Sequence, residues 1–236
     1  MIESAVSGFL PYVILIPSLF AVLVLIIPSR KKAAYTVLSL VGTAANLVFC
    51  ALIFGKDAVF TLPWCGFGID FSLRNYLFSS FILLSAAVFA FCTILYCTAF
   101  LKEKPYAKRF FAYLLFTMTL VNGAVLANNL VVLLFFWEGI LVTIFAMILL
   151  GGAKSWRTSV KSLVIVGLSD LCLMLGIGIA GHLAGTYAMD KISLPLTDSM
   201  GIAAFILIAI GAVAKAGAMP FHTWIPDAAE DAPMPF

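Results

Sequence analysis

The stretch that decides the fold is Gly211–Asp227, which reads GAVAKAGAMPFHTWIPD. It places Lys215 near the middle of residues 200–226, a mostly apolar segment long enough to cross a bilayer. A charge at that depth costs about 2.5–3.5 kcal/mol on insertion scales, so intramembrane lysines are usually functional. Pro220 lacks a backbone N–H and would clash with the carbonyl of Ala216, so we expect the helix to break beside the lysine.

Broken backbone at membrane depth must be buried in protein or line a wet cavity. A lysine at such a break therefore predicts an ion or proton path. The alternative is that Lys215 lies closer to the membrane surface and extends its ammonium group to the interface.

Composition places the chain among polytopic α-helical membrane proteins. Of its 236 residues, 64% are hydrophobic and 11% are charged, whereas about a quarter are charged in soluble proteins. The net charge of +3 is too small to indicate a nucleic-acid partner. Glu3 and a long apolar run argue against a cleaved signal peptide, so we expect the first span to be retained.

The cysteines indicate no redox or metal centre in this chain, and we expect no cofactor in it. They form no CxxC pair and show no metal-ligand spacing, so we interpret them as small apolar packing residues. The five are Cys50, Cys65, Cys92, Cys97 and Cys172.

The apolar segments predict an all-α polytopic membrane protein with about seven transmembrane helices, the seventh broken at Lys215. The predicted spans are 9–28, 33–54, 76–101, 110–127, 130–150, 162–184 and 200–226. Between the second and third spans, β-prone and alternating residues predict a small external β-hairpin at about 58–74, with its turn at Cys65-Gly66. We expect this hairpin to rest on a neighbour, because a lone hairpin is marginally stable.

The basic residues of the loops indicate the orientation in the inner (cytoplasmic) membrane. Loops 1–2, 3–4 and 5–6 carry ten lysines and arginines, against Lys56, Arg74 and Lys191 on the other side. The excess marks the first three loops as cytoplasmic. We therefore expect the N-terminus, and also the segment after the seventh span, to face outward.

Two acids lie inside the predicted spans. Glu138 is roughly 12 Å from the outer turn at Asn128-Asn129, too deep to reach water. A carboxyl group there must be protonated or paired with a cation, which predicts a proton carrier or half of an ion pair. The alternative is a neutral glutamate in a packing hydrogen bond. Asp170, within the sixth span, is subject to the same argument.

His222 follows Lys215 at a spacing close to two helical turns, so the two could share a face if the break is mild. An imidazole titrates near neutral pH and could pass protons, although a structural hydrogen bond at the break explains it equally well. At Asn122-Gly123 we favour an interhelical hydrogen bond over a water path. We expect His182 to lie at the surface.

Gly176, Gly178 and Gly181 match the dinucleotide pattern G-x-G-x-x-G. They lie inside an apolar helix and follow no strand, so the pattern does not indicate a nucleotide site. We interpret these glycines as positions of close helix packing.

Several blocks of sequence together resemble one family. They are RFFAY at Arg109–Tyr113, ANNL at Ala127–Leu130, FWEG at Phe136–Gly139, Ser169-Asp170, and Lys215 with MPFHTWIPDA at Met219–Ala228. The chain, over about residues 60–236, resembles the antiporter-like proton-pumping subunits of respiratory complex I. Related proteins are the membrane subunits of energy-converting hydrogenases and of multi-subunit Na⁺/H⁺ antiporters.

The resemblance implies a longer bundle of two inverted repeats with a broken helix in each. Residues 1–236 would be one transmembrane domain, with helices 1–3 and the hairpin at 9–101 and the first, incomplete repeat at 110–236. Lys215 and Glu138 match the proton-transfer pair of the family, and Asp170 matches the acid that tunes the lysine. Asn75 stands where the family often has Asp. The residues up to Phe236 match only the N-terminal half of the family and include neither its second repeat nor the relay residue of its helix 8.

The resemblance implies a proton-translocating subunit of a redox-driven complex, similar to NADH:quinone oxidoreductase or membrane-bound hydrogenase. Its partners would be other membrane subunits and a cytoplasmic redox arm carrying iron–sulfur clusters, flavin or a NiFe centre, with quinone as a further cofactor. One alternative is a subunit of a Na⁺/H⁺ antiporter. Another is a truncated scaffold, which would tolerate loss of charge at 138, 170 and 215 but not bulky residues at Gly176 or Gly178.

Overall fold

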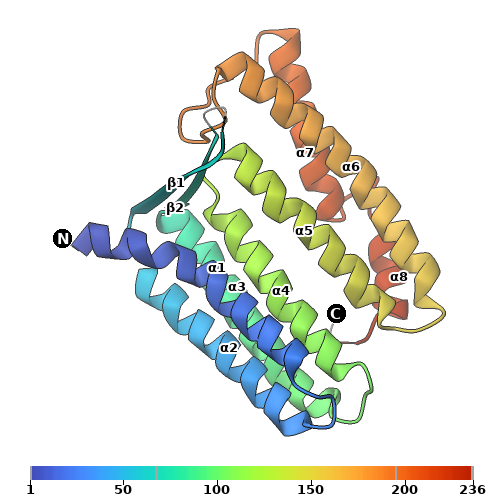
Figure 1. Ribbon diagram of the computed structural model, residues 1–236. Coiled ribbons are helices and arrows are strands. Elements are labelled where there is room, and N and C mark those ends of the chain that lie inside the picture. Colours follow the sequence, from blue (N-terminus) through green and yellow to red (C-terminus); the bar gives the residue numbers. More distant parts are fainter. Residues whose placement is uncertain (1, 67–68, 195, 235–236) are drawn as a thin grey trace. The chain divides into compact units, whose positions relative to one another are not determined.

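The computed structural model describes residues 2–66, 69–194 and 196–234, and these are mostly helical (Figure 1). Among them are six helices long and apolar enough to cross a membrane, α1 to α6. The chain forms two compact units. One comprises the residues up to Leu62 with Phe71–Ala127, and the other comprises Pro63–Asp70 with Asn128–Met234.

The first unit is built from four apolar helices that, apart from the start of α1, begin and end close to the predicted spans. Leu10, Val13 and Phe110 are among its fully buried side chains. The helices are α1 (Ile2–Ile26), α2 (Lys32–Ile53), α3 (Leu77–Phe100) and α4 (Ala107–Leu126).

A buried polar contact joins three helices of this unit. The side-chain amide of Asn122 on α4 donates to the carbonyl oxygen of Val13 on α1 and to Oδ1 of Asn46 on α2, both at 2.9 Å. Val13 lies four residues before Pro17, which has no N–H to offer its carbonyl. Asn122 supplies the missing donor, and the prediction of an interhelical hydrogen bond at this residue is confirmed.

Strands β1 (Ala58–Gly66) and β2 (Ile69–Asn75) pair in a two-stranded antiparallel sheet between α2 and α3. Cys65 and Gly66, expected to form the turn, belong to β1; the residues that connect the strands, 67 and 68, lie outside the described part of the chain. In the second unit the ring of Trp64 packs edge-on against Phe135, with centroids 5.8 Å apart. This contact gives the hairpin the expected support.

The second unit holds α5 (Leu130–Leu149), α6 (Ser155–Ala184), α7 (Ser199–Lys215) and the short α8 (Trp224–Asp231) (Figure 1). The long helix α6 packs against the other three. One apolar cluster, which includes Leu173, Ile177 and Ala204, joins α6 to α7. A second, which includes Val166 and Trp224, joins α6 to α8.

Close packing between α6 and α7 depends on glycines. A Cβ atom at Gly176 would lie 2.9 Å from the backbone nitrogen of Ile208, and one at Gly211 would lie 2.6 Å from Cβ of Leu173. Gly181 lies directly under the ring of Tyr187. The prediction of close helix packing is therefore confirmed at Gly176, whereas Gly181 packs against a residue of the loop after α6. It is wrong at Gly178, where no described neighbour lies within 4 Å of the position that a Cβ would take.

Two helices begin earlier than the hydropathy pattern suggested. α1 begins at Ile2 rather than near residue 9, and α6 begins at Ser155 rather than near 162. Hydropathy marks only the apolar part of a helix, and the first turns of α6 carry serine, threonine, arginine and lysine. The helix therefore extends beyond the apolar segment that the sequence revealed.

Helix α8, which follows the last apolar stretch, ends at the same end of the second unit as the α5–α6 loop. Thr158, near the start of α6, donates to the carboxylate of Asp231 at the end of α8. The expectation that this segment faces the opposite side from loop 5–6 is therefore wrong. The seven predicted crossings would in any case put the N-terminus and this segment on opposite sides of the membrane.

Candidate functional site

Helix α7 ends at Lys215 because Gly217 provides a left-handed cap. Gly217 has φ +69°, and its N–H donates to the carbonyl of Ala214 while Ala218 donates to Val213, both at 3.0 Å. This is the Schellman arrangement that commonly closes helices at glycine. Pro220 lies beyond the cap, so Gly217 ends the helix and the proline expected to break it does not. Lys215 thus occupies the last turn, where free carbonyls favour a cation.

Lys215 forms a buried ion pair with Asp170 of α6. Its Nζ lies 3.2 Å from Oδ2 of Asp170, and the two side chains are 8% and 2% exposed. The pair can form because α6 and α7 approach closely at Gly211, whose missing Cβ leaves room for Leu173 and the carbonyl of Ser169. Low exposure of both partners means that water contributes little to holding these charges.

Trp137 of α5 contacts both members of the pair. Its carbonyl oxygen accepts a 2.7 Å hydrogen bond from Nζ of Lys215, and the same nitrogen lies 4.4 Å from the centroid of its ring. Its indole N–H donates to Oδ1 of Asp170 at 2.8 Å. We call Trp137, Asp170 and Lys215 together the buried ion-pair site. Sequence reasoning gave Trp137 no role beyond its place in the FWEG block.

Glu138 follows Trp137 on α5 and lies beside this site. It interacts electrostatically with both Asp170 and Lys215. Its Oε1 is buried and has no hydrogen-bond partner among the described residues. The ion pair that Lys215 makes is with Asp170, and the Lys215–Glu138 proton-transfer pair expected from the resemblance stays a prediction.

His222 lies in the non-helical segment 216–223 between α7 and α8. Because the helix is interrupted there, the two-turn spacing from Lys215 does not put the two side chains on one helical face, and that expectation is wrong. The imidazole is half-buried, and its Nδ1 has no hydrogen-bond partner within the described ranges. His182, expected at the surface, is exposed at the end of α6.

Helix α8 is attached to both α6 and α7. Lys161 donates to the carboxylate of Asp227 at 2.6 Å and to the carbonyl of Thr223 at 3.0 Å. Trp224 donates its indole N–H to the carbonyl of Ala214, 3.3 Å away, next to the ion-pair lysine. These bonds fix the chain after the break and satisfy one of the last carbonyls of α7.

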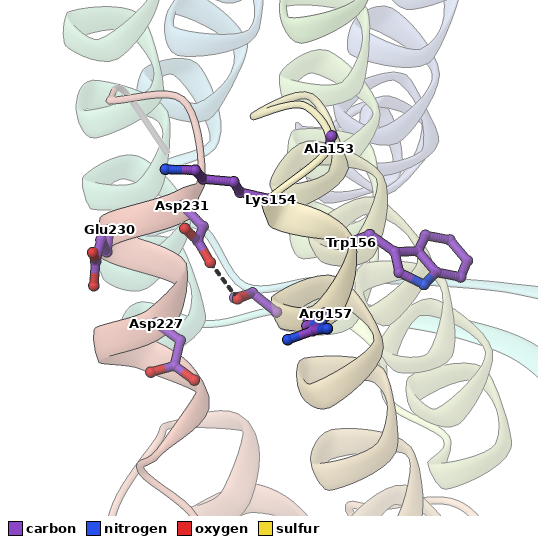
Figure 2. A pocket seen from close by; sticks show the side chains of 8 residues that line it. Ala153, Lys154, Trp156, Arg157, Asp227, Glu230 and Asp231 are labelled. Atoms are coloured by element: carbon purple, nitrogen blue, oxygen red, sulfur yellow. Dashed lines mark hydrogen bonds between the residues drawn. The ribbon is translucent and has the colours of Figure 1, made fainter.

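A polar pocket of about 620 Å³ lies between the start of α6 and helix α8 (Figure 2). Figure 2 shows Arg157 on the α6 side and the carboxylates of Asp227 and Asp231 on α8, with Asp231 bonded to Thr158 and the side chain of Lys154 extending in this view toward the end of α8. The pocket shares no residue with the buried ion-pair site. Among the residues that the structure describes, no three His, Cys, Asp or Glu side chains are grouped to hold a metal ion.

The comparison with known families identifies the C-terminal part of the chain. Residues 127–236, which contain the whole ion-pair site, match the family described as NADH:quinone oxidoreductase/Mrp antiporter, transmembrane. This part of the chain is similar to that family over its whole length. The resemblance inferred from the sequence blocks is thereby confirmed, and with its apolar helices the chain is an antiporter-like, multi-pass membrane protein.

Curated relatives come from both branches of the family. The chain is 30% identical over 185 residues to a Na⁺/H⁺ antiporter subunit of Alkalihalophilus pseudofirmus, covering 74% of this chain and 23% of that one. It is also 30% identical over 223 residues to NAD(P)H-quinone oxidoreductase chain 5 of a Picosynechococcus species, covering 85% of this chain and 33% of the relative. The chain thus spans a third or less of the length of these relatives.

The fold is shared with part of a solved complex. A chain of respiratory complex I from Thermus thermophilus superposes with a TM-score of 0.82 at 19% identity, covering 94% of this chain and 47% of that one. At this identity the likeness concerns the fold. The present chain corresponds to about half of that longer chain.

Proposed function

We propose that this chain carries the proton-transfer site of a proton-translocating membrane subunit in a redox-driven complex. The observation that carries the proposal is the ion pair of Lys215 and Asp170, buried at the end of α7 with Glu138 beside it. Buried ionisable groups in a membrane span are rare unless they serve transport. The family match and the identity with a quinone oxidoreductase chain support the same reading.

In the proposed mechanism Lys215 is the proton carrier. Its ammonium group is held by Asp170 and must lose or weaken this pairing before the proton can leave Nζ. The proton then passes to the carboxylate of Glu138, leaving a neutral amine and a neutral acid. A change of charge at either acid alters the balance at Lys215, because charges a few ångströms apart in a low dielectric interact strongly.

The interrupted backbone after α7 would supply the way to water. Residues 216–223 are not helical, and irregular backbone at membrane depth is tolerated where it is buried or lines a wet cavity. His222 lies in this segment and is proposed to pass protons between water and Lys215. In this proposal α7, the interruption and α8 together form a seventh, broken span.

The same proposal fixes the surroundings of the chain. It lies in the inner membrane, with the N-terminus and the β1–β2 hairpin outside and loops 1–2, 3–4 and 5–6 in the cytoplasm. Its partners are other membrane subunits and a cytoplasmic arm that carries the redox cofactors. The loop charges and the names of the relatives support this arrangement.

Substitution of the site tests the proposal in the complete complex, purified and reconstituted into lipid vesicles. Lys215→Ala and Glu138→Gln should each lower proton translocation about tenfold or more, because proton transfer by positioned groups contributes at least that much. Lys191→Ala, in the loop after α6, removes an exposed lysine and serves as the control. Dye quenching that reports proton uptake is measured together with electron transfer. Proton translocation per electron that is unchanged in both site variants would contradict the proposal.

A second candidate is a subunit of a cation/proton antiporter without a redox arm, favoured by the identity with a Na⁺/H⁺ antiporter subunit. The same site would then exchange protons for Na⁺. Purification of the complex from native membranes separates the two candidates. Iron–sulfur or flavin absorbance that co-purifies with the chain favours the redox-driven complex, and its absence with intact Na⁺-dependent proton exchange favours the antiporter.

A further inference from the structure

Trp137 is placed to act on both charges of the ion-pair site at once. Its carbonyl oxygen and ring face contact the ammonium group of Lys215, and its indole N–H contacts the carboxylate of Asp170. A single residue of α5 therefore bridges α6 and α7 at the point where the charges meet. A residue that served only to fill space between the helices would not need these three contacts.

Each of these contacts is strongest when Lys215 is protonated and Asp170 is ionised. A carbonyl oxygen and an aromatic face both attract a cation. An indole N–H can only donate, and it binds a carboxylate more strongly than a neutral acid. With Asp170 near one N–H and the Trp137 carbonyl on another, the ammonium group is held in one position.

The accepting carbonyl belongs to the peptide group that joins Trp137 to Glu138. The ammonium group of Lys215 is therefore held against the backbone of the acid that is proposed to receive its proton. Glu138 does not share an ion pair with Lys215 in this arrangement, and its buried Oε1 has no partner among the described residues.

We propose that Trp137 is a positioning residue for proton transfer, holding protonated Lys215 in its ion pair with Asp170 until the proton moves to Glu138. The inference rests on the proposed function and adds a residue that controls the transfer. In the step itself, one proton leaves Nζ of Lys215 and adds to a carboxylate oxygen of Glu138. Trp137 gives up no proton and acts only through its contacts.

Substitutions at Trp137 separate the contribution of its indole N–H from that of its aromatic face. Trp137→Phe keeps an aromatic face and removes the N–H, whereas Trp137→Leu removes both. Trp137→Tyr restores a donor at the edge of the ring and differs from the phenylalanine variant only by a hydroxyl. Trp156→Phe, at an exposed position near the start of α6, is the matched control for loss of an indole.

Proton translocation by the complete reconstituted complex is measured across a range of pH. We expect the rates to fall in the order wild type, Tyr, Phe, Leu, with about a tenfold loss for Trp137→Phe, because a hydrogen bond to a charged group has about that effect. The pH of half-maximal transport should also move in Trp137→Phe. Trp156→Phe should match wild type in both respects.

Two results would overturn the role inferred for Trp137 and leave the proposed function intact. One is a tyrosine variant no better than the phenylalanine variant. The other is a loss of rate in Trp137→Phe that follows its loss of thermal stability while the pH profile stays in place, as expected of a purely structural residue. Lys215→Ala is measured in parallel. If it retains full transport, the proposed function fails and the role of Trp137 fails with it.

Discussion

The carbonyl of Val13 loses its helical donor at Pro17, and Asn122 of another helix replaces that donor. The second bond of the same amide, to Asn46, extends the contact to α2. Backbone groups without a partner are costly in a membrane, which explains a buried asparagine among apolar side chains. The contact stabilises the first unit and involves no titratable group.

We expect Asn122→Leu to lower the stability of the first unit by about 1–2 kcal/mol, the usual range for hydrogen bonds between membrane helices. Thermal unfolding of the purified complex in detergent measures the loss. Thr93→Val, at a half-buried position on α3 whose hydroxyl donates to the carbonyl of Phe89 in the same helix, is the control. In a Pro17→Ala background the carbonyl regains its helical donor, so the cost of Asn122→Leu should be smaller. An equal cost in both backgrounds would disprove this role for Asn122.

The charged residues of the site could be predicted from the sequence, but their pairing could not. Charge inside an apolar span identifies Glu138, Asp170 and Lys215 without any structure. Which acid binds the lysine depends on the contact of α6 with α7, and a linear pattern does not contain it. Trp137 could have been noticed, because an indole N–H deep in an apolar helix needs a partner.

At the scale of elements, the contact between α6 and α7 determines the geometry of the ion pair. Gly176 and Gly211 allow the two backbones to approach, and the approach brings Asp170 to Lys215. The sequence predicted close packing at Gly176, but it treated Gly176 and Gly178 alike and gave Gly211 no role. In the same way it assigned the helix break to Pro220, because a proline is easier to recognise than a glycine that adopts a left-handed conformation.

The two glycines provide a matched test. Gly176→Leu should destabilise the second unit by about 1–3 kcal/mol through overpacking against α7, and should lower proton transport as the ion pair shifts. Gly178→Leu should change thermal stability little, because nothing lies within 4 Å of the added Cβ. Thermal unfolding and proton transport are measured for both. Equal losses of thermal stability in both glycine variants, together with unchanged proton transport in Lys215→Ala, would favour the scaffold alternative.

At the scale of the molecule, the direction of the chain through the membrane follows from the ends of the second unit. The hairpin tip packs by Trp64 against Phe135, near the start of α5, whereas the end of α8 bonds to the start of α6. α5 and α6 are each long enough to cross a membrane, so we expect these two contacts on opposite sides of it. Hydropathy found the spans, but only the contacts of α8 show that this helix ends beside the start of α6.

Labelling of thiols tests this orientation. Cys65 is exposed on the hairpin, and a membrane-impermeant maleimide should modify it in right-side-out vesicles. In a Cys65→Ser background, Glu230→Cys on α8 and Ala153→Cys in the α5–α6 loop should react only in inverted vesicles, because both positions line one pocket. Reaction of Glu230→Cys from the same side as Cys65 would show that α7 and α8 do not complete a crossing. The proposed seventh span, and the proton route through its break, would then have to be abandoned.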